Sequence, residues 1–415
     1  MSATANRITE LKAKLWNELV VKTDVVTDGV AVEPQALRAL RLGSDVKEQI
    51  QCLFVMDFEP HEGDLPAEFV TPHGLDVPVR WNPRSRYRIA LDGSTFILAD
   101  GEHEVFPISF HPRPGFYSRK TSDGKPMSTI AIASPDQHVF VVYSNECSYK
   151  DRGEDCLFCN INYTKSEFGE RQGLNHWKTP RQIGETIAAA AEEGLYRHLT
   201  VTGGVIPERR ELDYYLDVAE AIRAATGQER FNGTATVAAP LDLTNLDRLE
   251  EAGFRTTAMN LEIWDQRIYE VICPGKARGS GGWAHWVRAL EYAVGVFGHG
   301  RVRSNFVAGI EPKARTLEGL EVLASKGVVG TFTVWCPNPG SELRGHRAPE
   351  PAWYLDLAEK LVTIWKRNGI TYEHVYDANA SSVGIQHDLY RIQDELFPVF
   401  EDARRRPATS GAGRG

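Results

Sequence analysis

Three of the six cysteines lie on one short stretch, Cys147, Cys156 and Cys159, with the spacing C-x8-C-x2-C. Thiolates are soft ligands that suit zinc or an iron–sulfur cluster. Three thiolates are one fewer than the four that complete a structural zinc site or a cubane cluster. This stretch therefore predicts a metal centre with one position left open, where chemistry can occur.

Other uses of these thiols remain open from the residues alone. Cys147, Cys156 and Cys159 could join His176 in a structural zinc knuckle. Cys156 and Cys159 could instead form a redox pair, although the surrounding thioredoxin-like βαβ context is missing. The remaining cysteines, Cys52, Cys273 and Cys336, are scattered, so we expect no second cluster.

The stretch resembles the cluster loop of the radical SAM superfamily. The segment Cys156-Leu157-Phe158-Cys159 matches the second half of that family's motif, including the aromatic residue before the last cysteine. The first gap of eight residues departs from the usual three. The resemblance implies a [4Fe–4S] cluster held by Cys147, Cys156 and Cys159, with the fourth iron binding S-adenosylmethionine (SAM).

The same resemblance implies an enzyme that acts on a small molecule. A flavodoxin or ferredoxin would supply an electron, SAM would be cleaved to a 5′-deoxyadenosyl radical, and that radical would take hydrogen from the substrate. Cofactor or natural-product biosynthesis is the expected setting. A zinc-dependent barrel hydrolase, or a non-catalytic zinc-binding barrel protein, is the alternative. A hydrolase should show an H-x-H pair after the first barrel strand, and the sequence has none there.

Composition narrows the class of protein further. The chain has 415 residues, a formal net charge of −9 and 25% charged residues. An acidic chain argues against a binder of duplex nucleic acid, which needs a basic face. No apolar run approaches the ~18 residues that a membrane span requires. The N-terminus shows no signal-peptide core, so we expect a cytoplasmic protein, where an oxygen-sensitive cluster is protected.

From residue 138 onward, strand-like and helical patterns alternate, which predicts a parallel sheet with helices between the strands. The first loop of this series lacks G-x-G-x-x-G, which weighs against a dinucleotide-binding fold. The resemblance implies a partial (β/α)6 barrel. The expected strands are His138–Tyr143, His198–Thr202, Thr234–Val237, Thr256–Ile263, Val302–Ala308 and Thr331–Trp335, and Thr371–Tyr376 could add a seventh.

We therefore expect an α/β protein in four parts. These are an N-terminal α+β accessory lobe (1–125), the barrel (126–376), a helical extension (377–403) and a disordered tail (404–415). A helix should open the chain, and Asp92-Gly93 should turn a β-hairpin in the lobe. Thr179 with Gln182 should cap the helix that follows the cysteine loop.

In α/β barrels the chemistry lies at the carboxyl ends of the strands. The resemblance implies roles for residues at several strand ends in binding SAM. Gly203 and Gly204 would meet its amino group, with Val205 where the family has an acid, and Phe158 would lie near the adenine. Glu262 and Asn305 would orient the sugar, and Ser304 and Gly309 belong to the stretch that resembles the adenine-binding strand.

Further strand-end residues are candidates for contact with the substrate. Cys336 could donate a hydrogen atom, although a lone cysteine with apolar neighbours is usually inert. His374, Asp377 and Asn379 close the last expected strand and are our candidates for substrate contacts. Four basic residues could pair with an anionic substrate or with the SAM carboxylate, and we expect most to be solvated on loops: Lys276, Arg278, Arg301 and Arg303.

Overall fold

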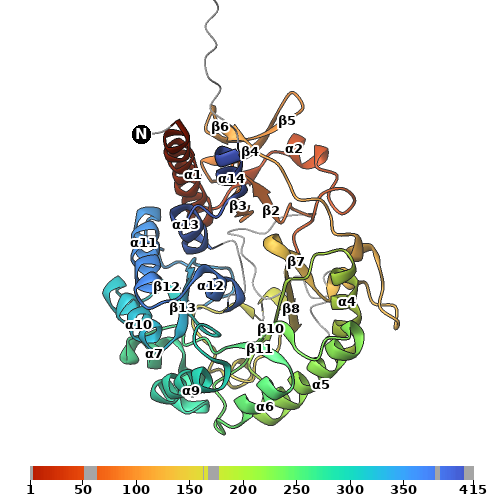
Figure 1. Ribbon diagram of the computed structural model, residues 1–415, viewed down its shortest axis with the longest axis vertical. Coiled ribbons are helices and arrows are strands. Elements are labelled where there is room, and N and C mark those ends of the chain that lie inside the picture. Colours follow the sequence, from red (N-terminus) through yellow and green to blue (C-terminus); the bar gives the residue numbers. More distant parts are fainter. Residues whose placement is uncertain (1–2, 51–62, 162, 167–176, 379–383, 406–415) are drawn as a thin grey trace, which may run out of the picture.

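A computed structural model gives the architecture and describes residues 3–50, 63–161, 163–166, 177–378 and 384–405. Cys52, His176, Asn379 and the tail beyond Arg405 lie outside these ranges. The described chain forms a curled sheet ringed by helices, with a smaller β-rich lobe above it (Figure 1).

The strands of the main sheet are β7 (Ile132–Ser134), β8 (His138–Ser144), β9 (His198–Gly203), β10 (Phe231–Thr236), β11 (Phe254–Ala258), β12 (Val302–Ala308) and β13 (Val328–Val334). They lie in the spatial order β13-β12-β11-β10-β9-β8-β7. The strands from β8 to β13 are parallel, and β7 runs antiparallel to β8. The predicted partial (β/α)6 barrel is confirmed.

Helices connect these strands along the outer side of the sheet (Figure 1). They are α4 (Pro180–Glu192), α5 (Glu208–Thr226), α6 (Asn245–Glu251), α7 (Gln266–Ile272), α8 (Pro274–Gly279), α9 (Gly282–Phe297), α10 (Lys313–Ser325) and α11 (Pro351–Arg367). Thr179 and Gln182 form the expected capping box at the start of α4. Such a box satisfies backbone N–H groups that the first helical turn leaves free.

The N-terminal lobe has its own sheet and its own small apolar core. Its elements are α2 (Pro34–Ala39), β1 (Ala31–Val32), β2 (Glu68–Val70), β3 (Asp76–Pro78), β4 (Tyr87–Asp92), β5 (Thr95–Asp100) and β6 (His103–Pro107). The predicted hairpin is confirmed, because β4 and β5 pair antiparallel with Asp92 opposite Thr95. Short 3-10 turns follow at Gly115–Ser118, Met127–Thr129, Pro135–Gln137 and Lys150–Arg152.

The helix that opens the chain, α1 (Ala3–Asp28), packs on helices from the other end of the chain. Its neighbours are α11, α13 (Ile385–Gln393) and α14 (Pro398–Arg405). Lys22 of α1 forms a fully buried ion pair with Asp388 of α13, with 2.5 Å between nitrogen and oxygen. The N-terminal helix and the C-terminal extension are thus joined against the barrel.

One of the expected strands is a helix in the structure, and another is shorter than expected. The segment predicted as a seventh strand, Thr371–Tyr376, is part of the helix α12 (Tyr372–Ala378). Val375, Tyr376 and Ala378 are buried, which is the spacing of one helical face. The strand expected over Thr256–Ile263 ends at Ala258, and Glu262 pairs with Phe306 only as an isolated bridge.

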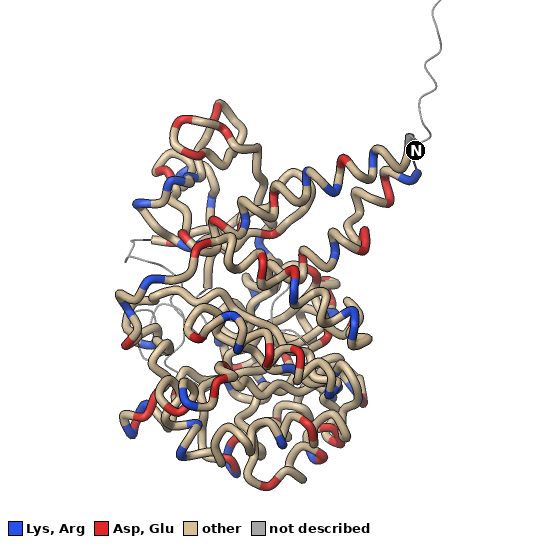
Figure 2. Tube along the Cα trace, turned by 90° about the vertical axis from the view of Figure 1, so that its left-hand side faces the viewer, with Lys and Arg blue, Asp and Glu red and all other residues tan. Residues whose placement is uncertain are grey.

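Charged residues of both signs are interspersed along the outer helices (Figure 2). In the ranges that the structure describes, no helix is both long enough and apolar enough to cross a bilayer.

Candidate functional site

A cavity of about 610 Å³ opens among the barrel strands and the N-terminal lobe. Most of the side chains expected to act in catalysis or cofactor binding line it. These are Cys147, Cys156, Cys159, Phe158, Gly203, Gly204, Glu262, Asn305 and Cys336. The expected residues from the ends of different strands therefore meet in one place.

The cysteine loop follows β8 and is held by backbone hydrogen bonds. The N–H of Cys159 donates to the carbonyl of Cys156 at 2.9 Å, and the N–H of Leu157 donates to Ile272 at 2.9 Å. All three thiols are half-buried at the cavity wall. Among the described side chains, no three His, Cys, Asp or Glu residues stand close enough to form a compact metal site as they are. In chemistry, the three thiols of the loop fit an iron–sulfur cluster.

A fourth cysteine lies beside this loop. Cys273, at the end of α7, is buried and interacts with the thiol of Cys156, which lowers the pKa of Cys156. Burial, together with the charges of Cys156 and Cys147, raises the pKa of Cys159. The sequence alone placed Cys273 among the scattered cysteines, because its contact with Cys156 spans more than a hundred residues.

The glycine pair at the end of β9 lies directly under the cysteine loop. A Cβ on Gly204 would lie 1.9 Å from the carbonyl oxygen of Glu146, and one on Gly203 would lie 2.7 Å from the ring of Tyr143. The N–H of Ser148 also donates to the carbonyl of Val205 at 2.7 Å. The glycines thus let the loop approach the sheet, while their backbone still lines the cavity.

Glu262 is a buried acid with a buried partner. Its Oε1 accepts a hydrogen bond from Nζ of Lys276 at 2.9 Å. Glu262 has a φ of 73°, a left-handed backbone conformation that is uncommon outside glycine. Lys276 also donates to the carbonyl of Asn260 and lies 4.7 Å from the ring centroid of Trp286. Lys276 was expected on a solvated loop and is instead a buried part of the site.

On β12, successive side chains face opposite sides of the sheet, which separates the expected SAM-binding residues Ser304 and Asn305. Asn305 lines the cavity, and its Oδ1 accepts hydrogen bonds from Thr331 and Thr333. Ser304 points away from the cavity, and its hydroxyl accepts from the N–H of Leu261 at 3.0 Å. Gly309 packs on Tyr354 and Pro349 instead of the cavity. Successive residues of a strand face opposite sides, so Ser304 and Asn305 do not share the cavity.

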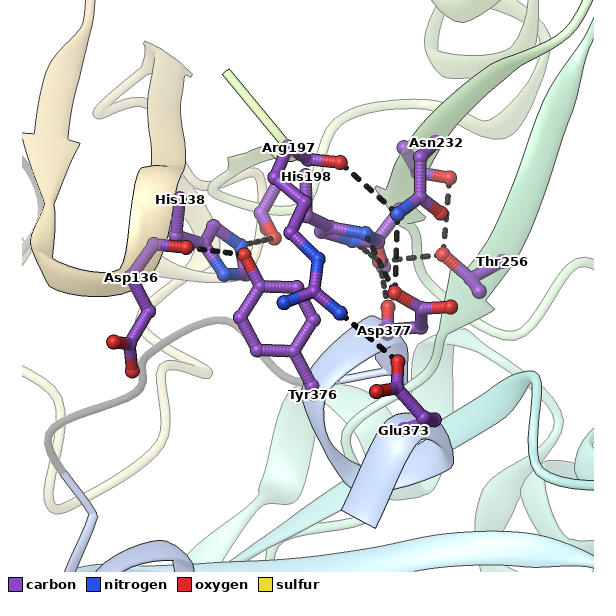
Figure 3. A network of polar contacts seen from close by, with 12 residues as sticks. Asp136, His138, Arg197, His198, Asn232, Thr256, Glu373, Tyr376 and Asp377 are labelled. Carbon is purple, nitrogen blue, oxygen red and sulfur yellow. Dashed lines mark hydrogen bonds and ion pairs between the residues drawn. The ribbon is translucent and has the colours of Figure 1, made fainter. Parts of the chain in front are cut away.

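Two of the three expected catalytic residues lie away from the cavity. His374 and Asp377 belong to α12, and the cavity lining does not include them. The ring of His374 lies 5.5 Å from that of His299, just before β12 begins. Asp377 accepts from Asn232 at 3.0 Å and lies 3.8 Å from His198 (Figure 3). They lie at the amino ends of the strands, opposite the cysteine loop.

Figure 3 shows how residues of α12 lie against residues at the amino ends of the strands. Tyr376 and Asp377 lie against His138 and His198, the first residues of β8 and β9. Burial lowers the pKa of His198 to about 3, so its imidazole is neutral. This contact layer explains why α12 is a helix that covers the strands and not a strand that extends the sheet.

The third expected catalytic residue, Cys336, lies in the cavity lining but is 2% exposed. Its thiol contacts Nη1 of Arg80 from the N-terminal lobe. Burial raises the pKa of Cys336. A buried thiol engaged by Arg80 is held in one position.

Of three further polar residues in the lining, the sequence named only Arg303, as one of four basic residues that could pair with an anionic substrate. Glu211 of α5 is buried, and burial raises its pKa to about 8. Arg303 of β12 and His387 of α13 are also buried and face the cavity. Arg303 lies two residues before Asn305 on β12, so the two side chains face the same side of the sheet. This spacing is the one signal in the sequence that could have placed the side chain of Arg303 in the cavity. Glu211 and His387 had no such signal.

The chain is similar in sequence to a known protein family and to a known hydroxylase. The sequence model of the family described as "Radical SAM superfamily" matches residues 141–332. The chain is 25% identical over 333 residues to bacteriochlorophyllide c C-7(1)-hydroxylase of Chlorobaculum limnaeum, covering 77% of this chain and 81% of that protein.

Three solved structures that match the chain share 14% identity with it. Methylornithine synthase matches with a TM-score of 0.40 over 61% of this chain and 68% of its own. Coproporphyrinogen III oxidase from Escherichia coli has a TM-score of 0.38 over 56% and 52%. The FeFe-hydrogenase maturase of Carboxydothermus hydrogenoformans has a TM-score of 0.37 over 65% and 80%.

Proposed function

Since this chain is an enzyme of the radical SAM superfamily, we propose that it removes a hydrogen atom from a small-molecule substrate in cofactor or natural-product biosynthesis. One observation supports this most directly. The three thiols of the cysteine loop and the glycine pair of β9 line the same cavity as Glu262 and Asn305. Residues that would hold a cluster, SAM and a substrate thus surround one volume.

Cys147, Cys156 and Cys159 are the residues that would hold a [4Fe–4S] cluster. When bound, the cluster and SAM supply a 5′-deoxyadenosyl radical, which attacks an unactivated C–H bond. The protein binds and orients the reactants and excludes water, and a mostly enclosed barrel suits that task. An electron must come from outside, and we propose a flavodoxin or ferredoxin in the cytoplasm as its source.

The remaining lining residues would bind SAM. Gly203 and Gly204 offer backbone groups next to the cysteine loop, and Phe158 offers a ring within that loop. Val205 occupies the place where the family has an acid, and Glu211 brings a buried carboxyl group to the same cavity. We propose that a carboxyl oxygen of Glu211 accepts a hydrogen bond from the ammonium group of SAM, while Glu262 and Asn305 face the ribose.

The relative from Chlorobaculum limnaeum suggests a first class of substrate to test. Its name gives a hydroxylation of bacteriochlorophyllide c. A cavity of about 610 Å³ is in the range of pockets that take molecules of drug size. We propose a bulky cyclic substrate, with tetrapyrroles as the first class to test and hydroxylation as the first reaction.

Anaerobic reconstitution tests the proposal. We expect about four irons and four sulfides per chain by the chemistry of a [4Fe–4S] cluster. The dithionite-reduced protein should give an EPR signal that changes when SAM is added, and 5′-deoxyadenosine should form slowly. One tightly held zinc, with no iron uptake and no response to SAM, would instead favour the zinc-binding barrel.

A further inference from the structure

Arg303 is a buried cation that forms no ion pair with any residue in the described part of the chain. It lies near the start of β12, is 5% exposed and lines the cavity. Among the described residues its guanidinium makes no hydrogen bond or ion pair, and its Nε is fully enclosed. A buried charge without a partner is strongly unfavourable, so such arginines are rare unless a ligand supplies the anion.

The acid that acts on Arg303 is already engaged, and so are two acids beside Lys22 and Arg391, the cations that act on His387. Glu262 is the acid whose charge acts on Arg303, and it is paired with Lys276 at 2.9 Å. Asp388 is paired with Lys22, and both Asp388 and Asp136 lie 3.7 Å from Arg391. Burial lowers the pKa of Arg303 to about 10, which still leaves it protonated at neutral pH. Within the described ranges, the positive charge of Arg303 therefore has no ion-pair partner.

His387 adds a second unsatisfied group to the same region. It is 1% exposed and lines the cavity, and both its ring nitrogens are buried with no hydrogen-bond partner in the described chain. The charge of Arg303 acts on His387, and burial lowers the pKa of His387 to about 3. A neutral imidazole keeps one N–H donor, which here has nothing to bind.

The position of Arg303 separates it from the cysteine loop. Arg303, Asn305 and Val307 all line the cavity from alternate positions of β12. Arg303 lies deepest, about 13 Å along the strand from Val307, at ~3.3 Å per residue. Its charge acts on His138 and His198, the first residues of β8 and β9, whereas the cysteine loop follows the end of β8.

We propose that Arg303 and His387 form a subsite at the closed end of the cavity that binds a carboxylate of the substrate. A carboxylate pairs with a guanidinium through two parallel hydrogen bonds and neutralises its single charge. A phosphate dianion would leave an unbalanced negative charge beside a neutral imidazole. The apolar cavity walls Phe140, Phe332 and Val334 then suit the remainder of the molecule. This inference rests on the proposed function, since it names the substrate class of that site.

The test uses 2-naphthoate and 2-naphthamide, which have nearly the same shape and differ in charge. Both are titrated calorimetrically into the full-length protein, before and after anaerobic reconstitution. We expect the wild type to bind the carboxylate about tenfold or more tightly than the amide, because charge-assisted pairs are roughly twice as strong as neutral ones. Arg303→Gln and Arg303→Met should reduce this ratio to about one, and His387→Phe should lower it in part.

Arg301→Gln is the matched control, because Arg301 is exposed two residues earlier and should keep the preference. The proposal is overturned if the wild type binds both probes equally or binds neither, or if the preference survives in both Arg303 variants. Arg303→Met should raise Tm, because it removes an unpaired buried charge. A lower Tm would show that groups of the chain balance the charge, and would count against a ligand.

The same variants distinguish this inference from the proposed function. Cluster assembly and the EPR response to SAM test the function, and they should remain intact in Arg303→Gln. Loss of the SAM response with the probe preference unchanged would assign Arg303 to the SAM carboxylate and overturn the subsite. Loss of the preference with the SAM response intact is the expected result.

Discussion

The carbonyl oxygen of Glu146 lies 1.9 Å from the point where a Cβ on Gly204 would stand. Glu146 immediately precedes the first cysteine of the loop, and Gly204 follows the end of β9. The N–H of Gly204 also donates to the carbonyl of Ser144 at 3.2 Å. Contact between these two backbones therefore sets the position of the cysteine loop on the barrel.

Gly204→Ala should displace this loop. Backbone cannot yield as a flexible side chain can, so the added methyl should cost about 1–3 kcal/mol of folding free energy. We expect iron uptake to fall with stability, measured by iron analysis after reconstitution and by urea unfolding. Gly295→Ala is the control, because no atom lies within 4 Å of its Cβ position in α9 and it should gain up to about 1 kcal/mol. Full iron uptake by Gly204→Ala would contradict this account.

Alanine at Cys147, Cys156 or Cys159 should each abolish stable iron binding. Two remaining thiolates cannot hold a cubane that needs at least three from the protein. Cys336→Ala should keep its iron, because that thiol is occupied by Arg80 and lies outside the cysteine loop. Iron per chain after reconstitution is the measurement, and equal iron in all four variants would show that the cysteine loop is not the ligand set.

Lys276→Met should destabilise the protein by about 3–5 kcal/mol, because it leaves the buried carboxylate of Glu262 without its partner. Adding Glu262→Gln in the same chain should recover part of this loss, since it removes the orphaned charge. The exposed pair of Lys360 with Asp356 provides a control, and Lys360→Met should change stability by about 0.5 kcal/mol or less. Additive effects of the two buried substitutions in urea unfolding would contradict the coupling.

The contribution of Glu211 to the stability of the protein should fall as pH rises from about 5 to 9. Burial raises the pKa of Glu211 from 4.5 to about 8 in the folded state. Between these values the folded state holds a proton that the unfolded state has released, so the stability that it contributes is complete below pH 4.5 and is lost as pH rises through 8.

Glu211→Gln should remove this part of the pH dependence, on the order of a few kcal/mol across the window. Glutamine is neutral at every pH and its side-chain oxygen can still accept from the N–H of Ala238, as Glu211 does. Urea unfolding of both proteins from pH 5 to 9 gives the comparison. Parallel curves for the two proteins would show that Glu211 does not titrate in this way.

Local patterns in the sequence were enough for much of the fold. The strand over Val302–Ala308 has the predicted bounds, and the hairpin at Asp92 and the capping box at Thr179 are present. These features depend on residues a few positions apart, so the sequence alone is enough to predict them. The segment from Cys147 to Cys159 likewise indicated the radical SAM superfamily, whose sequence model matches residues 141–332.

Only the tertiary structure determined which residues from distant parts of the sequence become neighbours. Lys276 and Arg303 look alike in the sequence as basic residues. In the structure Lys276 is paired with Glu262, whereas Arg303 faces the cavity with no ion pair to any described residue. His374 and Asp377 lie on a helix that covers the opposite end of the barrel. Burial and pairing depend on contacts between segments far apart in the chain, and these arise only when the sheet curls and brings its strands together.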